Sequence, residues 1–531
     1  MPLPPAPPYA GIANADESYF DVIQWSPPAN QPAHDVQAEA SDWDMLCLEP
    51  VLSQHASARI IIRPKIQWVN IGPYKTHQAV GQWAEVKMAD HPDVADVFIV
   101  EPEHLHIGCV VSHDDATCHL FFDPENDHLH FHNCGPHALS VQQLHGPGWY
   151  WLLPDTTVRL EVGVWNISTD AKPLVEIQVL KRKDWSIWEP RSSERTGLTD
   201  GDSSKRVKLS DGGGPAWVKK DAIAKDSQAA ISNNPLVELK QGQVILVGVG
   251  KVYWLGRLGT IHGGAMSTVW HAQHSNCRKG EKIVVKIIKP GPYGGDVVAA
   301  ANAWKKECET HVHLNGHPNI VPILGFDARF HSIYTAYLHA EALSSQLREG
   351  ASFSGTPADA LNIMQGIASA ICHSHSKNRV HNDIKPGNIL YSPESGAVLI
   401  DFGLSTILGE TTLAGTSFYL PPEYMGDWMM RGAPTDIWAL GVVMLWVLGR
   451  MTLPDLTEES WAVEDIHSDD LGAQLAAVGA MTMWLDYIEE KRSELDDTNP
   501  LEAIVKMTLE AQWYLRPNAA ELNCLLQRIG H

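Results

Sequence analysis

The segment Val380–Leu390 reads VHNDIKPGNIL, and it decides how the second half of this 531-residue chain is interpreted. It places a carboxylate at Asp383, a cation at Lys385 and an amide at Asn388. Thirteen residues beyond Asn388, the segment LIDFGL adds a second carboxylate at Asp401. The order D-x-K-P-x-N after a histidine, with Asp401 at this distance, is improbable by chance. The two segments are therefore interpreted as parts of one site.

Two segments upstream supply further charges. IVVKIIK, residues 283–289, places Lys286 in an apolar run typical of a β-strand. KKECETHVHLNGHPNIV, residues 305–321, offers Glu307 and Glu309 as carboxylate partners for Lys286. Either glutamate could instead lie on a solvated helix face.

From Val252 onward, strand-like segments come first and long helical patterns follow, which predicts a small β-rich lobe and a larger helical lobe. With the motifs above, the segment from about 241 to 531 resembles the eukaryotic protein kinase family of the Ser/Thr type. The resemblance covers about 290 residues. It implies an α+β, bilobal protein-kinase fold that uses ATP and Mg²⁺ and acts on Ser or Thr hydroxyls of protein substrates. The expected function is therefore an ATP-dependent protein serine/threonine kinase.

Phosphoryl transfer needs phosphates held still, charge neutralised and a hydroxyl oriented. The resemblance implies that Lys286 grips the α- and β-phosphates and pairs with Glu307, which lies ten residues before His317 as in related kinases; Glu309 is the alternative.

The resemblance also assigns the catalytic loop. Asp383 accepts the proton of the substrate hydroxyl, Lys385 stabilises the transferring phosphate, and Asn388 and Asp401 hold Mg²⁺. Phe402 is expected to pack under the helix that carries the paired glutamate.

Four residues within or after GTSFYLPPE, residues 415–423, are expected to support the structure of the site. Thr416 should touch the catalytic carboxylate, Glu423 should form a buried ion pair with Arg516, and Asp436 should anchor the backbone of the catalytic loop.

The glycine-rich loop departs from the family pattern. In LGTIHGGAMSTVW, residues 258–270, His262 and Ser267 stand at the first and third glycine positions, and Gly264 at the second; an insertion that uses Gly259 is the alternative. The nucleotide is expected to lie against Ile261, Gly263, Gly264, Val269, Val284, Lys286 and Leu390, with Val269, Val284 and Leu390 around the adenine.

The catalytic loop reads HND where most kinases read HRD. Asn382 cannot supply the charge with which the usual arginine binds an activation-segment phosphate. Activity is therefore predicted not to depend on phosphorylation of this segment, at Thr411, Thr412 or Ser417. His311 takes a position where a leucine usually joins an internal stack, and a buried neutral imidazole is expected there.

The region before the kinase-like segment divides into three parts. Residues 1–45, rich in Pro, Ala and Asp, are predicted to be disordered. Residues 46–185 show short apolar runs between turn signals, which predict a β-sandwich or barrel. Their strand rhythm resembles a degenerate forkhead-associated (FHA) domain, which implies binding to phosphoproteins. His128, His130 and His132 share one face if this stretch is a strand, and a polar surface is favoured there over a metal site.

Residues 186–240 are predicted to be a polar linker, and its cluster Lys205-Arg206-Val207-Lys208 resembles a nuclear-import signal. The net charge of −23 makes nucleic-acid binding unlikely. Eight scattered cysteines, no leader and no long apolar run predict an intracellular protein without a membrane span. A pseudokinase scaffold and a phosphopeptide-binding protein remain alternatives to an active kinase.

Overall fold

The computed structural model describes residues 60–65, 70–73, 86–88, 98–100, 109–113, 116–122, 129–144, 149–169, 172–180, 185–190, 217–220, 234–247, 253–278, 280–290, 297–327, 330–410, 412, 414–426, 432–457 and 461–529. The segment 1–45 that was predicted to be disordered lies outside these residues. So do Thr411, His128 and the basic cluster at 205–208.

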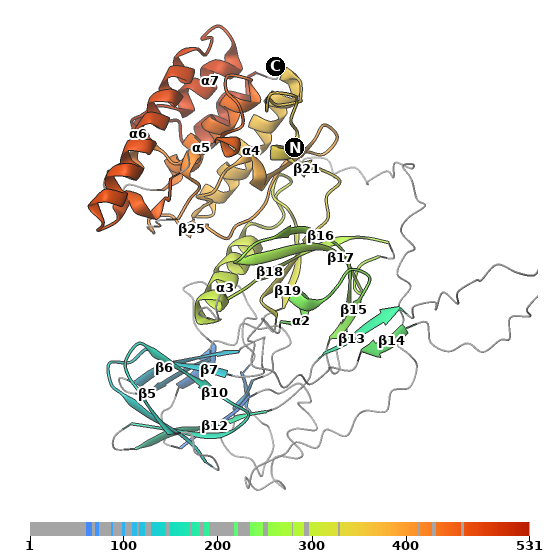
Figure 1. Ribbon diagram of the computed structural model, residues 1–531, viewed down its shortest axis with the longest axis vertical. Coiled ribbons are helices and arrows are strands. Elements are labelled where there is room, and N and C mark those ends of the chain that lie inside the picture. Colours follow the sequence, from blue (N-terminus) through green and yellow to red (C-terminus); the bar gives the residue numbers. More distant parts are fainter. Residues whose placement is uncertain are drawn as a thin grey trace, which may run out of the picture.

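Two antiparallel sheets form a sandwich in the N-terminal region (Figure 1). One has seven strands in the order β3 (Val86–Met88), β4 (Phe98–Val100), β1 (Ile60–Pro64), β12 (Pro173–Val179), β11 (Gly163–Ser168), β8 (Leu139–Gln143) and β9 (Trp149–Leu152). The other has five, in the order β10 (Thr156–Leu160), β7 (Leu129–Asn133), β6 (Ala116–Phe122), β5 (Cys109–His113) and β2 (Asn70–Pro73).

Alternation along the strands explains this packing. In β7, Leu129, Phe131 and Asn133 are buried while His130 and His132 are half-exposed, so one face of the strand meets the apolar core between the sheets. The prediction of a β-rich N-terminal region is confirmed, whereas its likeness to an FHA domain stays a prediction. Within the described residues, no group of His, Cys, Asp and Glu side chains is placed to hold a metal ion.

The small lobe of the kinase-like segment is an eight-stranded antiparallel sheet (Figure 1). Its strand order is β14 (Trp217–Lys220), β13 (Trp185–Pro190), β15 (Val244–Val247), β16 (Tyr253–Gly263), β17 (Ser267–His274), β18 (Ile283–Ile288), β20 (Ser332–Ala336) and β19 (Ile323–Asp327). The segment predicted as a polar linker, 186–240, thus contributes strands to this sheet, together with the short helix α2 (Pro235–Glu238).

Helix α3 (Val297–Leu314) packs on the sheet through its buried face. Trp304 and Cys308 are fully buried against Ile333 of β20. The indole of Trp304 also donates a 3.1 Å hydrogen bond to the carbonyl of Ser332. This packing fixes which face of α3 turns toward β18.

The α-helices of the large lobe within the described residues are α4 (Pro357–Ser376), α5 (Ala433–Val447), α6 (Leu471–Ser493), α7 (Pro500–Thr508) and α8 (Ala519–Gln527). Their starts are set by local chemistry. Thr356 and Asp359 form a capping box before α4, and Asn518 forms one with Glu521 before α8. Asp470 caps the first N–H groups of α6.

Helix α5 is buried on all sides, from Thr435 to Val447. Among the described residues, no helix is both long and apolar enough to span a bilayer. The α+β arrangement of a β-rich lobe followed by a helical lobe is confirmed as well.

Two small sheets lie where the lobes meet. One comprises β21 (Glu341–Ala342), β23 (Ile389–Ser392) and β24 (Gly396–Leu399); the other pairs β22 (Arg379–Val380) with β25 (Thr406–Ile407). The segment 381–388 is therefore held between β22 and β23, and residues 400–405 between β24 and β25. This arrangement brings the two sequence motifs together.

Candidate active site

Lys286 reaches the site because strand β18 alternates. Ile283, Val285 and Ile287 are buried, so Lys286 points to the opposite face of the sheet. Its ammonium lies 2.8 Å from Glu307 on α3 and 2.6 Å from Asp401.

The alternative partner, Glu309, lies elsewhere on the helix. Its carboxylate is 3.9 Å from Lys305, one turn back. The side chain of Glu307, by contrast, is only 4% exposed and faces the sheet. The structure thus pairs Lys286 with Glu307, the favoured choice of the sequence.

The opposite charges of Lys286 and its carboxylate partners stabilise the ionised forms of Lys286 and Asp401. Burial lowers the pKa of Lys286, but the carboxylates of Glu307 and Asp401 outweigh it and raise that pKa above its ordinary value. Burial raises the pKa of Asp401, yet the neighbouring ammonium and its hydrogen bonds lower it to about 2. Both groups are therefore charged at neutral pH, as phosphate and metal binding require.

A buried carboxylate holds the catalytic-loop segment. Asp436 of α5 is 1% exposed and accepts the backbone N–H groups of His381 and Asn382, each at 2.8 Å. It also lies 2.9 Å from the imidazole of His375. Burial raises the pKa of Asp436, but these partners lower it below its usual value. The predicted anchoring role is confirmed.

Asp383 lies at the centre of a polar cluster. The hydroxyl of Thr416 donates to one oxygen of Asp383 at 2.6 Å. The ammonium of Lys385 lies 2.9 Å from the other oxygen and donates to Thr416 at 2.9 Å. A hydroxyl, a cation and a carboxylate thus meet at one point, which is the geometry for orienting an acceptor hydroxyl.

Asn388 and Asp401 fit a divalent cation. The NH₂ group of Asn388 donates to the backbone carbonyl of Asp383 at 2.9 Å and to its carboxylate at 2.8 Å. This leaves the side-chain oxygen of Asn388 free to face a cation. With Asp401 it offers two oxygen ligands, the hard donors that Mg²⁺ binds beside substrate phosphates.

The backbone conformation at Asp401 sends the side chains of Asp401 and Phe402 into different environments. Asp401 adopts φ 63°, a left-handed conformation uncommon outside glycine. Its carboxylate is 42% exposed, whereas the next residue, Phe402, is fully buried. The phenyl ring lies 4.9 Å from the ring of His311 on α3 and 5.2 Å from that of His381. Phe402 thus packs under α3, as expected.

His311 is a buried neutral histidine. It is 3% exposed, and its Nε2 lies 2.7 Å from the carbonyl of Val321. Burial lowers its pKa to about 4, so the imidazole is uncharged at neutral pH. It fills the place of an aliphatic side chain while making a polar contact that leucine cannot make.

Asn382 joins two loops by its amide. Its φ of 65° is one that asparagine tolerates better than most residues. The side-chain NH₂ donates to the carbonyl of Leu404 at 3.1 Å and to the hydroxyl of Thr406 at 2.9 Å. These neutral bonds tie the catalytic loop to the start of the activation segment, and sequence reasoning did not foresee them.

The loop between β16 and β17 is a pinned hairpin. The N–H of Gly264 donates to the carbonyl of Ser267 at 2.9 Å, and the ammonium of Lys289 donates to the carbonyl of Gly264. The pairing shifts register between Arg257 and Gly259 and again before His262. Ile261 and Gly263 are exposed near the turn.

The three side chains assigned to adenine come from three strands. Val269 of β17, Val284 of β18 and Leu390 of β23 are all partly exposed, unlike their strand neighbours Trp270, Val285 and Ile389. Val269 is paired directly with Lys286 in the sheet. Val269 and Val284 therefore present apolar surface on the same face of the sheet as Lys286.

The end of the activation segment is fixed by an ion pair. Arg516 binds both carboxylate oxygens of Glu423, at 2.7 and 2.8 Å, and its guanidinium is fully buried. It also stacks on the indole of Trp438 at 4.8 Å. The predicted structural pair across nearly a hundred residues is confirmed.

A bilobal fold with a Lys–Glu pair, an anchored catalytic loop, and an aspartate and an asparagine whose side-chain oxygens suit a metal ion is typical of the protein kinase class. Consistent with this, the protein kinase domain family matches residues 256–524. That match covers just over half of the chain, and the chain belongs to this family.

Several curated proteins are similar over the same region. The serine/threonine-protein kinase PrkC of Bacillus subtilis is 31% identical over 225 residues, which is 41% of this chain and 34% of the relative. The calcium/calmodulin-dependent protein kinase cmkB of Emericella nidulans is 34% identical over 145 residues, which is 25% of this chain and 35% of the relative. The CBL-interacting protein kinase 22 of Oryza sativa is 31% identical over 227 residues, which is 38% of this chain and 49% of the relative. The chain thus spans a third to a half of these relatives.

The choice of Glu307 over Glu309 gives a matched pair of variants. We expect Glu307→Gln to lower ATP-dependent phosphate transfer by at least about tenfold, because the position of Lys286 is lost. Glu309→Gln should stay within about twofold of wild type, since Glu309 does not touch Lys286. Initial rates at saturating peptide measure both. Equal losses in the two variants would contradict the pairing.

Buried histidine should make stability sensitive to acid. The pKa of His311 is lowered to about 4, whereas an unfolded histidine titrates near 6.5. Neutral, buried His311 contributes fully to the free energy of unfolding above about pH 6.5. This contribution is lost as the pH falls toward about 4, and at pH 5 the free energy of unfolding is lower by on the order of 2 kcal/mol.

Melting temperatures of full-length protein between pH 7.5 and 5 measure this effect. His311→Leu should flatten the fall relative to wild type, and His262→Leu, which removes an exposed imidazole, should not. A His311→Leu protein that loses as much stability on acidification as wild type would refute the assignment.

Proposed function

We propose that this chain is an active protein serine/threonine kinase, which transfers the γ-phosphate of ATP to Ser and Thr hydroxyls of protein substrates with Mg²⁺. The single observation that carries the proposal is the cluster at Asp383. The hydroxyl of Thr416 donates a 2.6 Å hydrogen bond to the carboxylate of Asp383, and the ammonium of Lys385 contacts both residues. A substrate hydroxyl has the same chemistry as that of Thr416.

Each residue then has one task. Asp383 orients the acceptor hydroxyl and accepts its proton, and Lys385 stabilises the charge on the transferring phosphate. Lys286, fixed by Glu307, binds the other phosphates. Val269, Val284 and Leu390 lie against the adenine.

The metal site is proposed as Mg²⁺ held by Asp401 and the side-chain oxygen of Asn388. Bound there with the phosphates, the ion would neutralise negative charge on them. The Ser/Thr preference is supported by Lys385, a residue that Ser/Thr kinases typically carry at this position.

The deciding experiment compares wild type with Asp383→Ala for transfer of labelled γ-phosphate from ATP–Mg²⁺ to a generic basic protein and to the chain itself. We expect incorporation by wild type on serine and threonine, and loss of at least about a hundredfold in the variant. Equal background in both proteins, with ATP binding shown by a thermal shift, would favour the pseudokinase scaffold.

We expect activation-segment phosphorylation to have little effect. Asn382 is held by neutral bonds to Leu404 and Thr406, and its amide supplies no positive charge with which to bind a phosphate. Thr411→Ala, Thr412→Ala and the matching Asp variants should keep transfer rates within about twofold of wild type. A change of tenfold or more in either direction would overturn this expectation.

Two further proposals concern regions outside the catalytic lobes. Nuclear import through Lys205–Lys208 is tested by alanine replacement of the cluster and microscopy of a tagged chain; unchanged localisation would reject it. Phosphoprotein binding by the β-sandwich is tested with phosphothreonine and unphosphorylated peptide libraries, and equal retention of the two would reject it.

A further inference from the structure

The loop that joins β16 and β17 leaves two backbone N–H groups without a partner. The chain turns between Gly264 and Ser267, where the N–H of Gly264 donates to the carbonyl of Ser267 at 2.9 Å. Within the described residues, the N–H groups of Ala265 and Met266 make no hydrogen bond. Neighbouring free N–H groups in a turn form a concave site that suits a phosphate.

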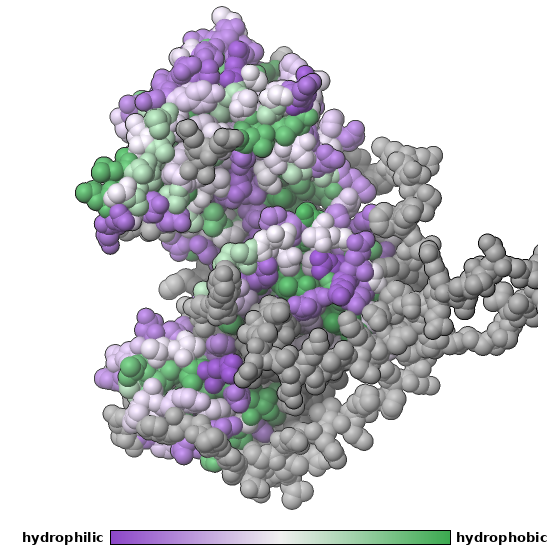
Figure 2. All heavy atoms as spheres, viewed as in Figure 1, coloured by the Kyte–Doolittle hydropathy of each residue, from purple (hydrophilic) through white to green (hydrophobic). Residues whose placement is uncertain are grey.

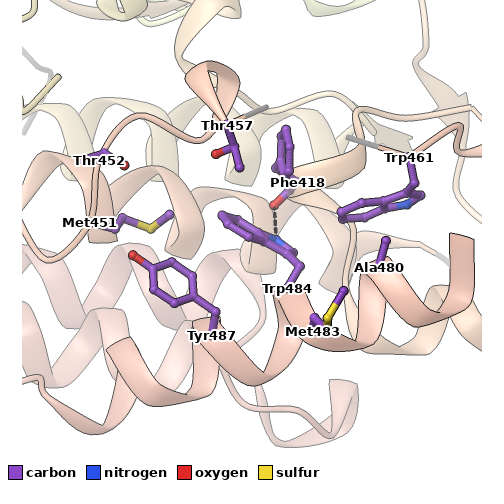
Figure 3. Close-up of a pocket in the computed structure, with 9 residues that line it drawn as sticks. All are labelled: Phe418, Met451, Thr452, Thr457, Trp461, Ala480, Met483, Trp484 and Tyr487. Carbon is purple, nitrogen blue, oxygen red and sulfur yellow. Dashed lines mark hydrogen bonds between the residues drawn. The ribbon is translucent and has the colours of Figure 1, made fainter. Parts of the chain in front are cut away.

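The surroundings of this loop suit a charged ligand. Figure 1 shows β16 and β17 on the side of the small lobe that meets the large lobe, and in Figure 2 hydrophilic residues gather on the small lobe where β17 is labelled in Figure 1. By contrast, the aromatic cavity of the large lobe in Figure 3 has no cationic side chain in its lining. Phosphates are therefore expected at the loop rather than in that cavity.

Lys289 lies on the opposite face of the sheet from Lys286. Ile288 of β18 packs against α3 on the side of Lys286, whereas Ile287 belongs to the core on the other face. The N–H of Lys289 donates to the carbonyl of Met266 at 2.8 Å, so the extended pairing continues by one residue. Because side chains alternate along an extended chain, Lys289 points away from the side of Lys286.

The ammonium of Lys289 fixes the peptide group between Gly264 and Ala265, because it donates to the carbonyl of Gly264. Every peptide bond of the described residues is trans. In a planar trans peptide the N–H points opposite to the carbonyl. The N–H of Ala265 is therefore directed away from Lys289, toward the face of the sheet on which Lys286 lies.

The imidazole of His262 also restrains the tip of the loop. It lies so close to Gly264 that a Cβ there would come within 3.1 Å of its Nε2. The carbonyl of His262 accepts a 3.4 Å hydrogen bond from the hydroxyl of Thr268. His262 stands at the first glycine position of the family pattern, so the loop gains a packing contact there and loses a close approach to phosphates.

We propose that Lys289 is a positioning residue for the phosphates of the nucleotide: by holding the carbonyl of Gly264, it turns the N–H of Ala265 toward them. The proposal rests on the kinase function proposed above and adds a residue to its nucleotide site. A loop with three glycines adapts its backbone to the phosphates, whereas this loop, with side chains at two of the three positions, depends on a lysine to set one conformation.

Equilibrium binding to the full-length protein tests this role without turnover. Calorimetry with adenosine, ADP–Mg²⁺ and ATP–Mg²⁺ compares wild type with Lys289→Met and Lys289→Arg. The control is Lys506→Met, which removes an ammonium of α7 that is paired with Asp497 in the large lobe. Melting temperatures verify that each variant folds.

We expect Lys289→Met to weaken the binding of ADP and ATP by at least about fivefold, and that of adenosine by less than about twofold, because only phosphates meet the tip of the loop. Lys289→Arg, which can donate to the same carbonyl, should restore most of the lost affinity. Lys506→Met should bind all three ligands like wild type. Unchanged ATP affinity in Lys289→Met, or an equal loss for adenosine, would overturn the proposal.

A double-mutant cycle distinguishes positioning from a direct contact of the ammonium with phosphate. Ala265→Pro removes the N–H that Lys289 is proposed to orient. Adding Lys289→Met to Ala265→Pro should then weaken ATP binding by less than about twofold, because the two changes remove the same interaction. Losses that multiply would show that the ammonium binds the phosphates itself and would overturn the positioning role.

Turnover separates this proposal from the kinase function. In phosphate transfer to a generic basic protein, the KM for ATP should be at least about fivefold higher in Lys289→Met than in wild type. Absence of both ATP binding and transfer in wild type would overturn the kinase function and the role of Lys289 together. Wild-type transfer with the same KM for ATP in Lys289→Met would overturn the role of Lys289 alone.

Discussion

The geometry of the site depends on one buried carboxylate. Asp436 comes from a helix buried on every side, and its two oxygens receive the N–H groups of His381 and Asn382. A buried charge is costly unless it is fully bonded, so the loop is held to the helix strongly and in one orientation. Asp383 and the rest of the loop follow from that orientation. The position of the catalytic loop is thus fixed by α5, a helix buried within the large lobe.

Aromatic and imidazole rings connect the two lobes at Phe402. Phe402 lies between His311 of the small lobe and His381 of the large lobe. A shift of α3 that carries Glu307 away from Lys286 must also move the imidazole of His311 off this ring. The position of the ion pair is therefore coupled to packing, and the neutral bonds of Asn382 hold the other end. This combination explains how an ordered site forms without an arginine–phosphate contact.

Local motifs predicted more of the site than of its surroundings. Asp383, Lys385 and Asn388 stand close together in the sequence, so their meeting needs only one loop, and the spacing to Asp401 matched a whole family. By contrast, the pairing of β13 and β14 with the kinase sheet depends on strands whose polar flanks predicted a linker. The bonds from Asn382 to Leu404 and Thr406 needed the fold, because the sequence shows only that an arginine is absent.

The irregular glycine loop affects which parts of the protein can contact the phosphates of a nucleotide. With side chains at two of three expected glycine positions, the backbone cannot approach phosphates as closely there. Instead, the loop is a paired hairpin held by Lys289 at Gly264. We therefore expect nucleotide binding to depend more on Lys286, on the oxygens of Asn388 and Asp401, and on the apolar strand surfaces. Interactions that hold the nucleotide equally in the ground and transition states lower KM. Interactions of Lys385 and Asp383 with the transferring group, in contrast, act on kcat.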